Sequence, residues 1–503
     1  MKTIDTFLNS ITMYRLVLFS LALLAFVAII LGFFGVIAFG GIALIVSLVV
    51  ILFSSFIANT LFAKIWKAPA NVESVWITGY ILFFLLEPLM TVDGVLTLVA
   101  ASIIAMLSKY IFAIGKRHLF NPAAVAALVL SLSGSGAVVW WVATPILSVV
   151  TLVVGLMIVR KIRRFKMFMI FVLVAIVTLV FTYLLPGGLT PMSFIGEILF
   201  SWPIIFFATI MLTEPLTTPP TTFTQGIYAA IVGLFFSSQL HLGAVYATPE
   251  FALIVGNIYS YIVSSKQKLL LKLVEIKQIS ATIFDLTFDS NIRLRFNPGQ
   301  YLEWTLPHQK PDSRGNRRYF TVASSPTEKD IHVAVRVAPK QSSSFKTSML
   351  HMHIGDTMVA SHLMGDFVLP ADVSKKLVFI AGGIGVTPFR SMIKYLADKK
   401  EKRDIVLFYQ TAKEEDLAFR DFFEIVKEAV GIKTVYVVTE PDTRWQGMTG
   451  RLTEKMIKGS LPDYDERIFF LSGPNPMVQS YKKLLLSLGI QKINIKTDYF
   501  PGF

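Results

Sequence analysis

Hydrophobic residues follow two different patterns along this chain of 503 residues. Up to about residue 265, long apolar runs such as VLFSLALLAFVAIILGFF are separated by short polar stretches. Each run is long enough to cross a bilayer core of ~30 Å, which takes about 20 helical residues. After residue 266 the pattern changes to short strands, charged turns and amphipathic helices. The sequence therefore predicts a membrane-embedded first half and a water-exposed second half.

The first half, residues 1–265, is expected to be a polytopic helical domain with about ten spans. Basic stretches AKIWK, GKRH, RKIRRFK and SSKQK all fall on the cytoplasmic side if the N terminus is inside, as the positive-inside rule requires. The first span lacks a convincing cleavage site and is expected to be retained. The predicted spans lie near 14–34, 37–62, 73–90, 94–114, 121–134, 143–160, 166–185, 192–212, 222–240 and 247–264.

An internal repeat supports this organisation. EPLMT at residues 87–91 returns as EPLTT at 214–218, and Pro122 returns as Pro249 at the same offset. With five spans in each half, the two halves must run in opposite directions through the membrane. The sequence thus predicts a five-plus-five inverted repeat.

Helices of such repeats are often broken where a ligand binds, because half-helix N termini offer free N–H groups. Asn121 and Thr248 are expected as N-caps of two such helices, and this favours a site for an anion or a flavin phosphate. The alternative is that these residues start ordinary helices. Glu87 and Glu214 lie near span ends, where they either are solvated, cap a helix or handle ions. The candidate helix breakers are Pro88, Pro122, Pro215 and Pro249.

Composition agrees with a membrane protein and excludes several classes of site. The chain is 54% hydrophobic and 16% charged, with a mean hydropathy of +0.62, and its net charge of +14 comes from basic clusters at span ends and linkers, so we expect no nucleic acid partner. The absence of cysteine excludes thiolate-held iron–sulfur clusters, disulfides and cysteine-ligated zinc. The membrane half contains only His118 and His241, which are too far apart to ligate two haems. We therefore expect no haem and no metal site.

Residues 268–372 are expected to form a small antiparallel barrel, because alternating strands are separated by Gly and Pro turns. Within it, RYFT at residues 318–321 resembles the FAD-binding motif of ferredoxin–NADP⁺ reductase-like flavoproteins. That resemblance places Arg318 at the FAD pyrophosphate, Phe320 on the isoalloxazine ring, and Thr321 near its reactive N5 edge, with Tyr319 as part of the same site.

SSSFK, further along the barrel, is a second candidate for the same pyrophosphate. Its backbone N–H groups and hydroxyls lie at a predicted helix start, and the candidate ligands are Ser343 and Ser344.

Residues 374–503 are expected to form a doubly wound α/β domain that binds NADH or NADPH. The buried strand KKLVFI leads into a glycine-rich turn and a helix that begins at a proline, which suits a pyrophosphate. Strands DIVLFYQ, KTVYVVTE and RIFFLSGP alternate with helices near 387–398, 416–429 and 475–488. The candidate ligands in the turn are Gly382, Gly383, Gly385, Thr387 and Pro388.

Two further segments resemble elements of the same reductase family. LSGPNPM resembles its Cys-Gly-Pro-x-x-Met element beside the nicotinamide, which implies roles for Ser472, Gly473 and Pro474, with serine in place of the usual cysteine. The final TDYFPGF resembles the C-terminal aromatic that covers the flavin. Phe500 is the first candidate for that aromatic and Phe503 the second; a packed terminus is the alternative. Lys413, after FYQTA, either meets a 2′-phosphate or is a solvated surface residue.

Residues 1–265 resemble a different family. KRHLFNPAAVAALVL and MLTEPLTTPPTTFTQGIYAAIVGLFF resemble the membrane flavin subunits of two bacterial respiratory complexes, the sodium-translocating NADH:quinone oxidoreductase and the Rnf complex. There FMN is attached to a threonine within Asp-x-x-Ser-Gly-Ala-Thr. Here Thr144 has that position, but Val138 replaces the acid, and Trp141 and Val142 replace Ser-Gly. Thr144 either caps the next span or lines a site for non-covalent FMN or riboflavin.

The two resemblances together imply a multi-pass cell-membrane oxidoreductase with a cytoplasmic reductase domain. Electrons would pass from NAD(P)H through FAD to a membrane flavin, and then to a quinone or an extracytoplasmic FMN-bearing protein. Two other functions stay open: an NAD(P)H:quinone reductase whose electrons never cross the membrane, and a transporter regulated by a redox-sensing flavin domain. The sequence leaves the choice between NADH and NADPH, ion pumping and the oligomeric state undecided.

Overall fold

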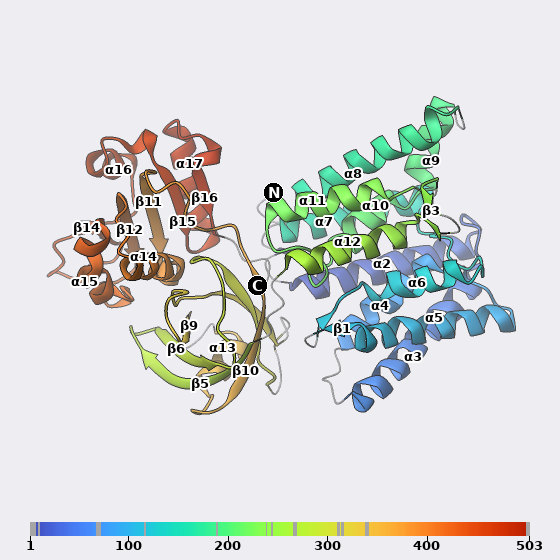
Figure 1. Ribbon diagram of the computed structural model, residues 1–503, viewed down its shortest axis with the longest axis horizontal. Coiled ribbons are helices and arrows are strands. Elements are labelled where there is room, and N and C mark those ends of the chain that lie inside the picture. Colours follow the sequence, from blue (N-terminus) through green and yellow to red (C-terminus); the bar gives the residue numbers. More distant parts are fainter. Residues whose placement is uncertain are drawn as a thin grey trace. The chain divides into compact units, whose positions relative to one another are not determined.

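The computed structural model divides into two compact units, one up to Lys266 and one from Gln267 onward (Figure 1). The first unit is helical, and the second contains two six-stranded sheets. The structure describes residues 7–8, 11–66, 72–114, 117–187, 190–237, 239–242, 245–264, 269–308, 312, 316–337 and 342–498.

Helices follow one another closely in the first unit. Five described helices are long and apolar enough to cross a membrane, and these correspond to predicted spans: α2 (Met13–Phe33), α3 (Gly41–Ile65), α5 (Val92–Ile111), α7 (Pro145–Ile162), and α8 (Phe165–Leu179) with its continuation to Leu184. The other predicted spans are shorter helices: α4 (Val72–Leu85), α6 (Pro122–Leu132), α10 (Ile204–Phe206) continued by a π-helix over Phe207–Met211, α11 (Thr222–Leu234), and α12 (Pro249–Val263). Ten complete crossings therefore stay a prediction.

Prolines account for part of this shortening. Helix α4 stops at Leu85, before Pro88, and the span predicted at 192–212 is divided by Pro203 into α9 (Pro191–Phe200) and α10. Proline lacks the N–H that an interior helical position needs, and it clashes with the preceding turn. The expected helix break at Pro88 is thus seen as a helix end, while the break at Pro203 was not predicted.

Helices α6 and α12 begin as the sequence predicts. The side chain of Asn121 accepts a hydrogen bond from the N–H of Ala124, and the side chain of Thr248 accepts one from Phe251, so both N-cap predictions are confirmed. A short hairpin precedes each helix: β1 (Ala113–Ile114) with β2 (Arg117–His118), and β3 (His241–Leu242) with β4 (Val245–Tyr246). The two halves therefore share local structure here, while their inverted orientation stays a prediction.

The second unit contains an antiparallel barrel that is built as the alternating pattern predicts. In the first strand Leu269, Leu271 and Leu273 are buried and their neighbours point outward. The short helix α13 (Ser344–Leu350) packs its Phe345 into the barrel core. The strands lie in the order β8 (Arg317–Thr321), β7 (Tyr301–Thr305), β10 (Thr357–Met364), β5 (Leu269–Gln278), β6 (Ile283–Ser290) and β9 (Ile331–Arg336).

A parallel sheet completes the second unit. Its strands lie in the order β14 (Met448–Thr449), β13 (Ile432–Val438), β12 (Ile405–Thr411), β11 (Leu377–Gly382), β15 (Ile468–Ser472) and β16 (Ile495–Thr497). The helices include α14 (Thr387–Lys399), α15 (Arg420–Val430), α16 (Glu454–Ser460) and α17 (Asn475–Ser487). Helix α15 starts later than predicted, because Glu414–Asp416 forms a separate 3-10 turn and Phe419 takes a left-handed conformation.

A cluster of charged side chains lies at the end of the parallel sheet where β15 begins. The buried guanidinium of Arg467 donates to both carboxylate oxygens of Asp404 at 2.8 and 2.9 Å and to both of Asp463 at 2.9 and 3.0 Å. Lys376 also donates to Asp463 at 2.8 Å. Hydrogen bonds from Arg467 and Lys376 hold the pKa of Asp463 well below its usual range.

This shift predicts acid-sensitive stability. A lowered folded-state pKa adds stability above the unfolded-state pKa of about 4, and this is lost as pH falls through the folded-state pKa. Asp463→Asn should lower the melting temperature at pH 7, and its difference from wild type should narrow below about pH 4. Glu454→Gln, which breaks an exposed pair with Lys458, serves as the control. A difference in melting temperature between Asp463→Asn and wild type that does not change with pH would contradict the lowered pKa of Asp463.

Candidate functional site

The predicted flavin motif lies on strand β8, and its side chains alternate as the strand requires. Arg318 and Phe320 both face Phe345 of α13: the Arg318 guanidinium carbon lies 5.3 Å from its ring centroid, and the two phenylalanine rings lie 5.9 Å apart. Tyr319 points away from them, and its hydroxyl donates to Glu303 at 2.8 Å. The structure therefore brings Arg318 and Phe320 together beside the predicted serine segment and places Tyr319 on the other face of the strand.

Hydrogen-bond donors converge beside α13 on the carboxylate of Asp312. Arg318 Nη2 donates to one oxygen at 3.0 Å, and the backbone N–H of Ser344 donates to the other at 3.1 Å. Ser343 is the N-cap of α13 and accepts from the N–H of Lys346. Carboxylate and phosphate oxygens accept the same donors, so this arrangement fits an FAD pyrophosphate. Sequence reasoning missed Asp312, because nothing local in HQKPDSRGN marks it as the partner of Arg318.

The glycine turn lies at the C-terminal end of β11. Gly383 has φ +53°, and no described atom lies within 4 Å of the position that a Cβ would take there. At Gly385 a Cβ would lie 2.5 Å from the backbone carbonyl atoms of Ser472, so only glycine fits where this turn approaches the end of β15. The turn continues into α14 at Thr387 and Pro388. Open space at Gly383 and a helix start beside it fit the pyrophosphate of NAD(P)H.

Ser472, the last residue of β15, lies directly beside this turn. Its buried hydroxyl donates to Asp498 at 3.0 Å, and the backbone N–H of Asp498 donates to the carbonyl of Leu471 at 2.9 Å. Gly473 and Pro474 follow and lead into α17. Asp498 was missed from sequence, although an acid two residues before the predicted aromatic Phe500 was the available signal. The predicted aromatics Phe500 and Phe503 lie outside the described residues.

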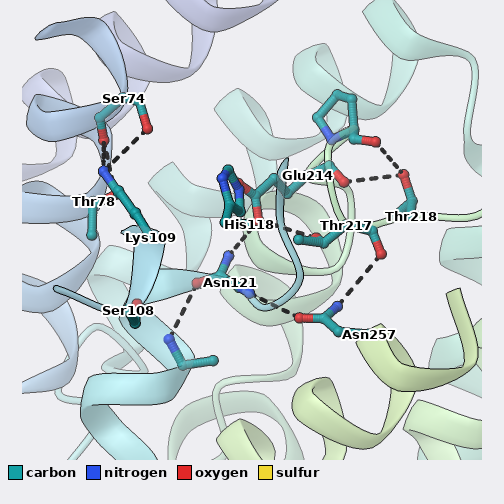
Figure 2. A network of polar contacts seen from close by, with 12 residues as sticks. Ser74, Thr78, Ser108, Lys109, His118, Asn121, Glu214, Thr217, Thr218 and Asn257 are labelled. Atoms are coloured by element: carbon teal, nitrogen blue, oxygen red, sulfur yellow. Dashed lines mark hydrogen bonds and ion pairs between the residues drawn. The ribbon is translucent and has the colours of Figure 1, made fainter. Parts of the chain in front are cut away.

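The first unit has its own polar cluster at the start of α6 (Figure 2). Asn121 Nδ2 donates to Glu214 at 2.8 Å, Thr217 donates to the same carboxylate at 3.1 Å, and His118 Nε2 lies 3.7 Å from it. The backbone N–H of Asn121 donates to Asn257 Oδ1 at 2.9 Å. The anion beside this half-helix is thus the chain's own Glu214, and a cofactor role for Asn121 stays a prediction.

Thr144 occupies the N-cap position of α7, but its side chain makes no capping hydrogen bond. Thr144 thus occupies the cap position that the sequence predicts, without the side-chain hydrogen bond that usually accompanies it. Its hydroxyl is buried and has no hydrogen-bond partner among the described atoms, and the same holds for Thr151 two turns further along α7. A buried polar group without a partner is costly, so these hydroxyls are candidates for contact with a bound molecule.

Lys413 does not distinguish NADH from NADPH. Its side chain is 59% exposed, and its ammonium lies 3.6 Å from Glu415 on the same turn. This fits a solvated surface lysine and leaves the coenzyme open.

Comparison with known proteins places the C-terminal half in context. The family model "Oxidoreductase NAD-binding domain" matches residues 379–483. The chain is 26% identical over 219 residues to the glycine betaine monooxygenase reductase subunit of Chromohalobacter salexigens, covering 42% of this chain and 58% of that protein. It is 28% identical over 240 residues to the flavohemoprotein of Oceanobacillus iheyensis, covering 46% of this chain and 58% of that protein.

A third relative is covered more fully. NADH-cytochrome b5 reductase 1 of Aspergillus terreus is 31% identical over 202 residues, which cover 39% of this chain and 68% of that protein. The chain spans less than two thirds of the first two relatives.

Proposed function

Because the C-terminal half of this chain belongs to the family of FAD- and NAD(P)H-dependent oxidoreductases that includes NADH-cytochrome b5 reductase, we propose that the whole protein is a membrane-bound flavoprotein oxidoreductase. It moves electrons from NAD(P)H through FAD to an acceptor in its own membrane unit. The observation that carries this proposal is that two groups in the second unit suit a pyrophosphate: the donors of Arg318 and Ser344, which meet on Asp312, and the glycine turn with open space at Gly383.

Different residues of the second unit are proposed to bind FAD and NAD(P)H. FAD, when bound, accepts a hydride and returns electrons one at a time. Arg318 and the N–H of Ser344 would hold its pyrophosphate, and Thr321, at the end of β8, would lie near its N5 edge. The turn around Gly383 would hold the pyrophosphate of NAD(P)H. The Ser472 hydroxyl gives its one proton to Asp498, so near the nicotinamide it would offer its oxygen as an acceptor.

The acceptor in the membrane unit is proposed to be non-covalent FMN or riboflavin beside Thr144. The buried hydroxyls of Thr144 and Thr151, which have no hydrogen-bond partner among the described atoms, support this. The proposal also draws on the resemblance of motifs in residues 1–265 to membrane flavin subunits, which stays a prediction. A quinone or an extracytoplasmic flavin protein is the proposed final acceptor, with the reductase domain in the cytoplasm.

Thr144→Val separates a ligand role from a structural one. Valine keeps the shape and removes a hydroxyl that has no hydrogen-bond partner among the described residues, so folding stability should not fall. If the hydroxyl contacts a flavin, the variant should lose membrane flavin, measured by extraction and chromatography of the purified protein. Thr97→Val, at an exposed hydroxyl bonded to the carbonyl of Asp93, is the matched control. Unchanged flavin content in Thr144→Val would contradict this role.

Acceptor kinetics test the proposal as a whole. Full-length protein in lipid vesicles should oxidise NADH or NADPH when a quinone or an external flavin protein is present. Quinone reduction with FAD as the only flavin would favour a reductase whose electrons never cross the membrane. FAD reduction by NAD(P)H with no acceptor activity would instead favour a transporter that carries a redox-sensing domain.

A further inference from the structure

The barrel and the nucleotide domain are joined by a fork-shaped ion pair between Arg390 and Glu328. Arg390 follows shortly after the glycine turn on α14, and Glu328 lies in the segment that connects β8 to β9. Nη2 of Arg390 donates to Glu328 Oε1 at 2.9 Å, and Nη1 donates to the other carboxylate oxygen. The side chains are 11% and 18% exposed, so the pair is largely shielded from water. Bidentate pairs of this kind fix orientation as well as distance.

Further contacts extend this join along both segments. Nη1 of Arg390 also donates to the carbonyl of Ala323 at 3.1 Å. The next residue of α14, Ser391, is fully buried and donates from its hydroxyl to the carbonyl of Ser324 at 2.6 Å. Two consecutive residues of α14 thus bind two consecutive carbonyls of the barrel segment.

Both partners of the ion pair are themselves held in place. The N–H of Ser325 donates to Glu328 Oε2 at 2.6 Å, and the N–H of Glu328 returns a bond to the carbonyl of Ser325. The guanidinium of Arg390 lies 5.5 Å from the ring of Phe422 and 5.9 Å from that of Phe419. Movement of either side chain therefore requires several other contacts to break.

The residues of this contact lie close in sequence to both predicted nucleotide sites. Ala323 comes two residues after Thr321 of the flavin motif, and Arg390 comes two residues after Pro388, at the end of the glycine turn. Hydride transfer requires the reacting atoms to lie about 3–3.5 Å apart, and an error of about 1 Å can cost roughly a hundredfold in rate. Because the contact is this near to both predicted nucleotide sites along the chain, a shift in it would change the distance between them.

We propose that Arg390 is a positioning residue for hydride transfer: through Glu328 it sets the distance between the nicotinamide and the flavin, without touching either. This inference rests on the proposed function of the second unit. Arg390 and Glu328 belong to neither predicted nucleotide site, so their loss should spare the binding of FAD and NAD(P)H and slow the step between them.

Stopped-flow reduction of FAD in the full-length protein tests this. Arg390→Gln and Glu328→Gln should lower the reduction rate at saturating NADH about tenfold, while the half-saturating NADH concentration changes less than about threefold. Arg390→Lys keeps the charge but loses the fork and should lie nearer to Arg390→Gln than to wild type. FAD content should be unchanged, and the double variant Arg390→Glu with Glu328→Arg should recover part of the rate.

Lys458→Gln, which breaks an exposed pair with Glu454 on α16, is the matched control and should match wild type. The inference is overturned if the Arg390 and Glu328 variants reduce FAD at the wild-type rate. It is also overturned if FAD content and melting temperature fall together with the rate and the double variant restores none of them. If wild type itself is reduced by neither NADH nor NADPH, the proposed function fails and this inference fails with it.

Discussion

Gly385→Ala is expected to lower reduction of the flavin by NADH or NADPH roughly a hundredfold, because nucleotide and flavin can no longer align. The added Cβ would lie 2.5 Å from the backbone carbonyl carbon and oxygen of Ser472. Backbone atoms cannot rotate away as a flexible side chain can, so the glycine turn and strand β15 must move apart. That shift displaces both Gly383 and Ser472, which face the coenzyme in the proposed site. Anaerobic stopped-flow absorbance measures the rate.

Gly459→Ala is the matched control for this change. Gly459 lies in α16, and nothing described lies within 4 Å of the position of its Cβ. The control should be reduced at the wild-type rate. A wild-type rate in Gly385→Ala would show that the turn tolerates the displacement, and that the coenzyme binds elsewhere.

Arg318→Gln is expected to weaken FAD binding by about ten- to a hundredfold, because a charge-assisted hydrogen bond of roughly 1.5–3 kcal/mol is lost. The guanidinium of Arg318 is buried and meets Asp312 at 3.0 Å, beside the N–H of Ser344. Glutamine retains a donor but neither the charge nor the fork. FAD retained by the purified protein, and the dissociation constant from fluorescence titration, measure the effect.

The adjacent Arg317→Gln is the natural comparison. Arg317 lies one position earlier on β8 and makes a longer contact, 3.5 Å, with Glu303. Because strand neighbours point to opposite faces, this variant should keep FAD. Equal loss of FAD from both variants would indicate damage to the strand and would contradict a specific role for Arg318.

Local patterns in the sequence were sufficient for much of this fold. Helix α14 was predicted over 387–398 and observed over Thr387–Lys399, because a strand, a glycine turn and an N-terminal proline mark its start. The caps at Asn121 and Thr248 were equally readable, because an N-cap depends only on residues three positions away. Alternation along β8 places Arg318 and Phe320 on one face, but it also puts Tyr319, predicted as part of the same site, on the other face beside Glu303.

Contacts between distant segments were not readable in this way. Asp498 meets Ser472 and Glu328 meets Arg390, and in both pairs the partners are brought together only by the tertiary fold. Asp312 lies only six residues before Arg318, yet nothing in the intervening segment marks the two as partners. The same holds for Glu214. Its position near the end of a predicted span suggested several roles, and only the fold places it beside Asn121.

Thr144 shows a different limit. Threonine before proline at a helix start is a common N-cap pattern, yet here the side chain makes no capping bond. Sequence predicts which residue occupies the cap position, but the packing around it decides where the hydroxyl points. The unpaired hydroxyl became visible only in the structure.

The central claim is that electrons from NAD(P)H reach a second flavin in the membrane unit of the same chain. Anaerobic titration of the purified full-length protein with NADH and NADPH, followed by visible absorbance and identification of the extracted flavins, tests it most directly. We expect two flavins per chain, FAD and either FMN or riboflavin, with both bleached by the coenzyme. A protein that contains FAD alone, or a second flavin that stays oxidised, would contradict the claim.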